Sequence, residues 1–171
     1  MTPASPDAAA PAGLPSGRFT GREAFGQLVR DALAGAAREG WREIILCDAD
    51  FQDWPLGERA VAQALQDWSV SGRRCTLLAR RYDSVVRSHA RFVTWRSRWS
   101  HIIEARACPS ADPLDLPSAI WSPGWVMQRL DPERCTGYCG SEPERRVLLR
   151  ESLNEWLLKS SPAFPASTLG L

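Results

Sequence analysis

The chain has 171 residues, of which 44% are hydrophobic, and its formal net charge at pH 7 is +1. A chain of this length can bury a substantial core within one domain, and its near-zero charge excludes a generally acidic or generally basic protein. No apolar run approaches the ~20 residues of a membrane-spanning helix, and residues 1–14 lack the basic and apolar regions of a signal peptide.

Residues 1–17 are rich in Ala, Pro, Ser and Gly, which bury little apolar surface, so we expect a disordered N-terminal segment before a domain at 18–160. Thr20-Gly21-Arg22-Glu23 has the form of a capping box, which predicts a helix start at Thr20. Gly40 supplies the end of this helix. Six apolar residues recur between them at helical spacing: Phe25, Leu28, Val29, Ala32, Leu33 and Ala36.

Three short runs have the length and composition of strands, at residues 43–47, 75–79 and 101–106. The third alternates weakly between apolar and polar residues, which indicates a position nearer an edge of the sheet. Helical segments separate the three runs, and strands separated in this way pair in parallel through right-handed crossovers. The first half of the chain therefore predicts a parallel βαβαβ unit.

The two helices between these strands each carry an apolar stripe. The first stripe runs from Leu56 to Trp68, and this helix ends near Gly72. The second helix covers residues 81–98, with a break near His89. Its inward side is predicted to contain Tyr82, Val85, Val86, Phe92 and Trp95.

The pattern changes after the third strand. Residues 119–121 and 125–130 predict an antiparallel hairpin, which a turn at 131–134 and a short strand at 136–139 follow. The loop before the hairpin is marked by three prolines: Pro109, Pro113 and Pro117.

The end of the chain predicts a helix and an extended tail. Ser141-Glu142-Pro143-Glu144 has the form of a second capping box, which opens the helix. Residues 161–171 contain two prolines and predict a tail beyond the domain. The apolar side of the helix is predicted to contain Val147, Leu148, Trp156 and Leu157.

These elements predict a single α/β domain with a mixed sheet, a parallel βαβαβ core, helices on both faces, a late antiparallel hairpin and a C-terminal helix. Several motifs accompany this order: Asp48-Ala49-Asp50-Phe51 with Trp54-Pro55-Leu56, Arg91-Phe92 with Trp95-Arg96, Trp99-Ser100-His101, and Arg129-Leu130-Asp131. The order of elements resembles one phospholipase D-like domain. The first half is also similar to a bacterial family of undetermined function seen mostly in proteobacteria.

Active phospholipase D-like enzymes carry His-x-Lys-x4-Asp followed by Gly-Ser-x-Asn. With the motif's Asp placed on Asp131, Gly124 stands at the His position and Val126 at the Lys position, and the segment 137–140 does not match the second motif. The resemblance therefore implies a degenerate domain without the attacking imidazole and without the cationic clamp. Asp131 is interpreted as a turn residue before Pro132. Because active members pair two such domains, the resemblance also implies a homodimer.

The function predicted from these observations is a non-catalytic, cytoplasmic module that binds a protein partner or an anionic ligand, without a cofactor. Asp48 and Asp50 follow a buried strand, where open α/β sheets present their ligand sites. His101 has no Ser or Cys nucleophile that the sequence places beside it, so we assign it no catalytic role. The predicted ligand-binding residues are Asp48, Asp50, Arg80, Arg81, His101, Trp121 and Trp125.

An enzymatic alternative uses Asp48 and Asp50 as Mg²⁺ ligands of a phosphohydrolase, since hard oxygen donors suit that metal. Against it, Phe51-Gln52 does not continue the motif of haloacid dehalogenase-like phosphatases, and the chain's one Lys, Lys159, lies in the final helix. We favour an interpretation in which Asp48 and Asp50 make local turn bonds and Asp53 caps the next helix.

A second alternative is an RNA-binding surface. Residues 73–106 contain nine Arg and two His against two acidic residues, and aromatic side chains lie among them. The preceding segment, 43–67, has the opposite sign, with six acidic residues and one Arg. We favour a solvated surface in which the two segments pair, and do not expect nucleic acid as the partner.

The five cysteines are an odd number without the spacing of a disulfide framework, which favours reduced thiols. Cys135 and Cys139, with Cys108 and a His, form a weak zinc-binding pattern, since their spacing is not that of a standard zinc site. We expect buried thiols instead.

Overall fold

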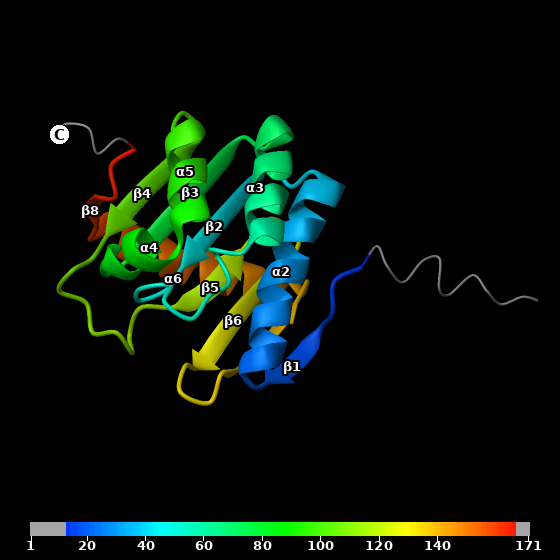
Figure 1. The fold of residues 1–171 in the computed structure, drawn as a ribbon. Helices are drawn as coiled ribbons and strands as arrows, with labels where there is room; N and C mark the ends of the chain where they lie inside the picture. Colours follow the sequence, from blue (N-terminus) through cyan, green and yellow to red (C-terminus); the bar gives the residue numbers. More distant parts are fainter. Residues whose placement is uncertain (1–12, 167–171) are drawn as a thin grey trace, which may run out of the picture.

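Eight strands form one mixed sheet in the structure, a computed structural model that describes residues 13–166 (Figure 1). The parallel strands β2, β3 and β4 lie side by side, and every other pair of neighbours is antiparallel. Across the sheet the order is β1 (Gly17–Thr20), β7 (Thr136–Gly140), β6 (Val126–Asp131), β5 (Ser118–Trp121), β2 (Glu43–Cys47), β3 (Arg74–Ala79), β4 (Ile103–Ala107) and β8 (Ser161–Pro162).

Helices cover both faces of this sheet (Figure 1). One face carries α2 (Arg22–Glu39), α3 (Arg59–Ser71), α4 (Asp83–Ser88) and α5 (Ala90–Arg98), and the other carries α6 (Pro143–Leu158). The predicted α/β fold class, with its parallel βαβαβ core, late hairpin and C-terminal helix, is confirmed. The predicted break near His89 is also confirmed, since it separates α4 from α5.

Two hydrophobic cores, one on each face of the sheet, explain why β2 is apolar at each position from 44 to 47. Ile44 and Leu46 pack with the helices α2, α3 and α5, whereas Ile45 and Cys47 pack with α6. Because successive side chains of a strand point to opposite faces, a strand buried on both sides needs an apolar residue at each position.

The structure has a strand that ends at Thr20, where the sequence predicts the start of a helix. Gly17–Thr20 is strand β1, and Thr20 pairs with Thr136 of β7. Gly21, with a φ of 100°, precedes α2, and no side chain caps this helix. The predicted capping box is therefore wrong, because Thr20 is already held in the sheet. Leu14 also packs against the core, and residues 1–12 of the predicted disordered segment lie outside the described residues.

Three apolar residues that the periodicity placed inward are exposed: Val86, Val147 and Leu148, at 59%, 56% and 64%. In α6 the residues that turn to the sheet are Leu149 and Leu153 instead. Because this helix has apolar residues on more than one side, the spacing of its apolar residues does not show which side is buried. The second predicted capping box is also wrong, because Glu142 precedes the helix and no side chain caps it.

The predicted tail packs on the domain as far as residue 166. Ser161–Pro162 forms β8 on the edge of β4, and Phe164 is buried against Tyr82, with ring centroids 4.9 Å apart. Residues 167–171 lie outside the described residues. The five cysteines are buried free thiols, as the sequence predicts.

Candidate functional site

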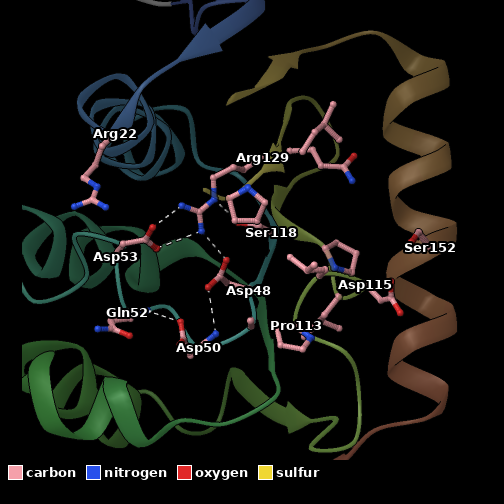
Figure 2. Close-up of a pocket in the computed structure, with 17 residues that line it drawn as sticks. Arg22, Asp48, Asp50, Gln52, Asp53, Pro113, Asp115, Ser118, Arg129 and Ser152 are labelled. Atoms are coloured by element: carbon pink, nitrogen blue, oxygen red, sulfur yellow. Dashed lines mark hydrogen bonds and ion pairs between the residues drawn. The ribbon is translucent and has the colours of Figure 1, made fainter. Parts of the chain in front are cut away.

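A cleft of about 760 Å³ opens where β2 ends, between the amino end of α2 and helix α6 (Figure 2). Asp48 and Asp50 enter it directly after β2, and the loop that precedes β5 forms its opposite wall. Strand β5 runs antiparallel to β2, so Ser118 begins β5 at the edge of the sheet where β2 ends. Strand β6 runs antiparallel to β5, so Arg129, near the end of β6, pairs with Ser118 at the same edge. The topology thus brings residues 48 and 129 to one place.

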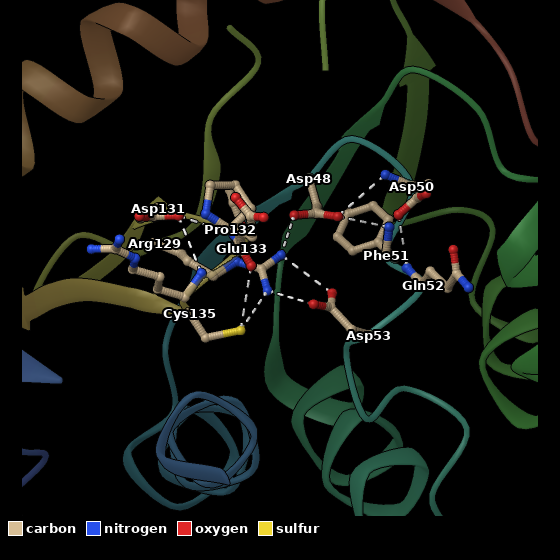
Figure 3. Close-up of polar contacts among 12 residues, drawn as sticks. Asp48, Asp50, Phe51, Gln52, Asp53, Arg129, Asp131, Pro132, Glu133 and Cys135 are labelled. Carbon is tan, nitrogen blue, oxygen red and sulfur yellow. Dashed lines mark hydrogen bonds and ion pairs between the residues drawn. The ribbon is translucent and has the colours of Figure 1, made fainter. Parts of the chain in front are cut away.

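Arg129 is the centre of the polar contacts at the floor of the cleft (Figure 3). Its Nη1 and Nη2 atoms donate to the two carboxylate oxygens of Asp53 at 2.6 and 3.2 Å. Nη2 also donates to Oδ1 of Asp48 at 3.0 Å, and Nε donates to Oγ of Ser118 at 3.1 Å. The guanidinium group is therefore satisfied by protein groups on each of its nitrogens.

Arg129 and Asp48 are buried, whereas Asp53 is partly exposed. The side chains of Arg129 and Asp48 are 3% and 5% exposed, and that of Asp53 is 32% exposed. The guanidinium carbon of Arg129 lies 4.1 Å from the ring centroid of Phe25, a cation–π contact. Burial by itself lowers the pKa of Arg129, but the hydrogen bond to Asp53 and the charges of Asp48 and Asp53 outweigh it and raise that pKa. Arg129 is thus a permanent cation held by two carboxylates.

A tight turn fixes the residues that follow β2. Oδ2 of Asp48 accepts hydrogen bonds from the amides of Asp50 at 3.2 Å and Phe51 at 2.8 Å, and Oδ1 of Asp50 accepts one from the amide of Gln52 at 3.0 Å. The predicted local turn bonds are therefore confirmed. Phe51 has a φ of 58°, which is strained for a residue with a side chain. The buried His89 lies with its Nε2 atom 2.9 Å from the Phe51 carbonyl oxygen, which accepts its hydrogen bond.

Asp53 does not cap the next helix, contrary to the prediction. Helix α3 begins at Arg59, and Glu58 precedes it without a side-chain cap. Asp53 lies five residues earlier and is bound to Arg129 instead. Helix α3 begins too late in the chain for Asp53 to occupy its N-cap position, and the Asp53 carboxylate forms a bidentate ion pair with Arg129.

The mouth of the cleft is acidic. Asp50 and Asp115 line it together with Gln52, and Arg22 reaches it from α2 (Figure 2). The lining contains four carboxylates, of Asp48, Asp50, Asp53 and Asp115, against the guanidinium groups of Arg22 and Arg129. Two leucines of the lining, Leu114 and Leu130, are 79% and 65% exposed. The cleft therefore combines an excess of negative charge with exposed apolar side chains.

Arg80 and Arg81 lie at the same edge of the sheet but line a different hollow, beside Tyr82 and Phe164. Nε of Arg80 donates to the carbonyl oxygen of Ala111 at 2.6 Å. The hollow is largely apolar and has a volume of about 430 Å³. The two arginines are therefore not part of the cleft that contains Asp48 and Asp50.

The remaining predicted residues lie at the opposite edge of the sheet. His101 precedes β4, and Trp121 and Trp125 lie at the far end of the hairpin between β5 and β6. Nε1 of Trp121 donates to the carbonyl oxygen of Arg146 at 2.9 Å, and that of Trp125 donates to the carbonyl oxygen of Pro15 at 3.0 Å. The structure therefore does not bring these three predicted residues together with Asp48, because the parallel and antiparallel strands carry them to the opposite end of the sheet.

The three positions that align with the His, Lys and Asp of the phospholipase D-like motif do not lie together either. Gly124 lies in the hairpin turn, Val126 is fully buried, and Asp131 is at the other end of β6. Oδ1 of Asp131 accepts hydrogen bonds from the amides of Glu133 and Arg134 at 3.1 and 3.2 Å, so its predicted role as a turn residue is confirmed.

Residues 13–166 contain no group of three or more His, Cys, Asp or Glu side chains arranged to hold a metal ion. In the cleft, Asp48 uses Oδ1 for Arg129 and Oδ2 for two backbone amides. Its oxygens are thus already engaged by protein donors. This donor set fits Mg²⁺ poorly.

Arg129 and Asp53 are the site residues that the sequence reasoning missed. One signal could have found Arg129: Met127 and Arg129 are two positions apart in a predicted strand, so they share a face. Met127 is buried in the core, and an arginine on that same face requires a carboxylate partner.

No protein-family model matches the sequence, and no curated protein matches it. Among solved structures, the fold is similar to TrmBL2, an archaeal chromatin protein that binds DNA, at 16% identity and a TM-score of 0.63. This similarity covers 86% of the chain and 54% of TrmBL2. It is also similar to the phosphatidylserine synthase of Haemophilus influenzae Rd KW20, at 10% identity and a TM-score of 0.54.

The similarity to the synthase covers 88% of the chain and 40% of the synthase. The chain therefore spans about half of one of these proteins and two fifths of the other. At these identities the similarities show the fold alone. None of the helices within residues 13–166 is long and apolar enough to cross a membrane.

Proposed function

We propose that the chain is a non-catalytic binding module of phospholipase D-like fold, and that its cleft binds a ligand carrying an amine or guanidinium group. The observation that carries this proposal is the charge of the lining, where four carboxylates face two guanidinium groups. A cation placed between Asp50 and Asp115 would offset the excess negative charge.

The sequence alone suggested an anionic ligand, and the contacts of the cleft favour the opposite sign. Arg129 is the buried cation of the site, but its nitrogens are bound to Asp48, Asp53 and Ser118. A phosphate or carboxylate ligand would have to displace these bonds and would then face the two carboxylates. Breaking a buried ion pair leaves an unpaired charge, which costs about 3–5 kcal/mol. Of the two arginines in the lining, Arg22 forms no ion pair with a residue of 13–166 and stays available to an anion.

The contacts of the cleft support a binding role over catalysis. The lining contains no His, Lys or Cys side chain that could serve as nucleophile or clamp for phosphoryl transfer. The Mg²⁺-dependent alternative would need free oxygens on Asp48, and both are engaged. Exposed Leu114 and Leu130 offer apolar contact to the rest of the ligand, which suits a small amine or a basic side chain of a partner protein.

A thermal-shift experiment tests the sign of the ligand. Agmatine, which carries an amine and a guanidinium group, is compared with inorganic phosphate at equal ionic strength. At ten times its Kd a ligand stabilises the folded state by about 1.4 kcal/mol, and for a chain of this size this raises Tm by roughly 3–6 °C. We expect this shift with agmatine and none with phosphate.

The matched variants are Asp50→Asn with Asp115→Asn in the cleft, and Asp31→Asn with Asp67→Asn, which are exposed on α2 and α3. The cleft pair should abolish the agmatine shift, and the control pair should retain it. A shift with phosphate instead of agmatine, or equal shifts in both double variants, would contradict the proposed site.

The enzymatic alternative has a separate test. A chromogenic phosphomonoester is incubated with the full chain and Mg²⁺, and the release of phosphate is compared with that of Asp48→Asn. The proposal predicts the same background rate in both. Mg²⁺-dependent turnover that disappears in Asp48→Asn would establish the phosphohydrolase and exclude a non-catalytic module.

A further inference from the structure

A second groove lies away from the cleft, on the face of the sheet that α2, α3, α4 and α5 cover. It has a volume of about 300 Å³ and runs between α3 and α5, which lie side by side on that face (Figure 1). Each helix contributes residues at positions i, i+3, i+4 and i+7, so each presents a single stripe to the groove. The stripes are Arg59, Ala62, Gln63 and Gln66 on α3, and Arg91, Thr94, Trp95 and Arg98 on α5.

The lining of this groove contains three arginines and no acidic side chain. Arg59, Arg91 and Arg98 are exposed, and none of the three forms an ion pair within residues 13–166. Arg91 donates one hydrogen bond, to the carbonyl oxygen of Gly57 at 2.8 Å. The groove is therefore positive in a molecule whose net charge is only +1.

Two acidic residues adjoin the groove without lining it: Glu58, next to Arg59 in the chain, and Asp67, which accepts a hydrogen bond from Gln63 at 2.9 Å. Glu58 precedes α3, and its carboxylate is bound by both Nε and Nη2 of Arg30, at 2.7 and 2.9 Å. The first turn of α3 contains no acidic residue, and no side chain caps its amides. The partial positive charge of this helix end thus adds to that of Arg59.

An aromatic pair stands at the other end of the groove. Trp99 and His101 lie with their ring centroids 5.7 Å apart at an angle of 32°. Nε1 of Trp99 donates to Oε1 of Gln66 at 3.0 Å, which ties the pair to the lining of the groove. His101 is exposed, and Trp99 is half-buried. The motif Trp99-Ser100-His101 thus places a stacking surface beside Arg98.

We propose that this groove binds single-stranded nucleic acid, with the arginines on the phosphates and the Trp99–His101 pair stacked on a base. Arg91 and Arg98 are seven positions apart on α5, which spans on the order of 10 Å along the helix. This span gives room for successive phosphates of one strand. Guanidinium groups that follow a backbone, combined with aromatic rings that stack on bases, are the chemistry by which proteins hold single strands.

The experiment is a titration of the full chain into fluorescein-labelled 20-nucleotide oligothymidylate and oligouridylate, followed by fluorescence anisotropy at several salt concentrations. Arg59→Gln with Arg98→Gln should weaken binding on the order of tenfold and reduce the salt slope by about 1.4, because each lost phosphate contact contributes about 0.7 on single strands. The charge-matched control, Arg18→Gln with Arg134→Gln, removes two exposed arginines from β1 and the β6–β7 turn and should bind like the wild type.

His101 tests the aromatic part of the proposal. His101→Ala should weaken binding about fivefold through lost stacking, and His101→Phe should restore it. Because His101 is exposed, these variants should fold normally. Preference for oligouridylate or oligothymidylate would identify the strand as RNA or DNA.

Several results would overturn the proposal. One is the absence of binding to both oligonucleotides at 50 mM salt. Another is equal affinity of the groove and control double variants. A third is that duplex DNA binds as tightly as the single strands and that His101→Ala leaves the affinity unchanged. Binding to phosphatidylserine vesicles in place of oligonucleotides would assign the groove to a membrane surface instead. None of these outcomes depends on whether agmatine binds the cleft.

Discussion

Arg129 and Asp48 are separated by 81 positions in the chain, yet Nη2 of one lies 3.0 Å from Oδ1 of the other in a buried site. This pair joins the end of β2 to the end of β6, which are not neighbours in the sheet, since β5 lies between them. The same Asp48 carboxylate also holds the turn at Phe51. The ion pair therefore links the late hairpin to the loop that forms the floor of the cleft.

Replacing Arg129 should destabilise the fold severely. Arg129→Leu leaves Asp48 buried without its cation, and removal of one member of a buried pair costs about 3–5 kcal/mol. The free energy of unfolding from urea denaturation measures this loss. Arg134→Leu, in the exposed turn after β6, should change it by less than about 0.5 kcal/mol. If Arg129→Leu lowered the free energy of unfolding no more than Arg134→Leu does, the stabilising role of the buried pair would be contradicted.

An added methyl group should destabilise the fold at Gly137 and leave its stability unchanged at Gly124. A Cβ at Gly137 would collide with the Gln128 carbonyl oxygen and lie 2.8 Å from the Arg129 Cα atom, whereas a Cβ at Gly124 would meet no atom within 4 Å. Gly137→Ala should therefore cost about 1–3 kcal/mol or more by overpacking. Gly124→Ala should stay near the wild type in urea denaturation. A neutral Gly137→Ala would contradict the close approach of β7 to β6.

Adjacent leucines of α6 test which side of this helix is buried. Leu149 is 4% exposed and Leu148 is 64% exposed. Leu149→Ala should cost about 2–5 kcal/mol, because a buried leucine leaves a cavity, and Leu148→Ala should change stability by less than about 0.5 kcal/mol. Thermal unfolding of the two variants decides between the observed face and the one that the periodicity favoured.

The buried thiols should make the fold sensitive to alkali. Burial raises the pKa of Cys47 and Cys75, so the folded state keeps both protons while the unfolded thiols ionise near pH 8.5. Stability is then complete below pH 8.5 and is lost as pH rises above it, by about 1.4 kcal/mol per thiol at pH 9.5. Urea denaturation at pH 7.5 and 9.5 measures this loss.

The control for the alkaline effect is the double variant Cys47→Ala with Cys75→Ala. Its unfolding free energy should be lower at pH 7.5, because two buried side chains are truncated, but it should fall less between pH 7.5 and 9.5 than that of the wild type. An identical fall in the two proteins would exclude these thiols as its cause.

The central part of the fold could be predicted because it is encoded locally. The runs at 43–47 and 75–79 are apolar at nearly every position, which only a strand buried on both faces requires. Strands β1 and β8 could not be found in this way. Gly17–Thr20 has no apolar run, and it becomes a strand because β7 offers a free edge to it. The two-residue β8 likewise depends on the edge of β4.

The candidate site was predicted in part. Asp48 and Asp50 could be placed at a strand end from local pattern, and both line the cleft. Arg80 follows β3 at the same edge, but its side chain turns to Ala111, which no local rule specifies. Trp121 and Trp125 lie at the opposite end of the sheet from Asp48, because β5 runs antiparallel to β2, a pairing that no local pattern specifies. Pairings across long stretches of chain decide such positions.

The most direct test of the proposed cleft is a titration of the ¹⁵N-labelled chain with agmatine, followed by two-dimensional ¹H–¹⁵N NMR spectra. The account predicts that the amide signals of Asp50, Gln52 and Asp115 shift in a saturable way, that those around Arg59 and Arg98 do not, and that Asp50→Asn with Asp115→Asn abolishes the shifts. Saturable shifts confined to any other part of the molecule, or shifts at the cleft with phosphate and none with agmatine, would contradict it.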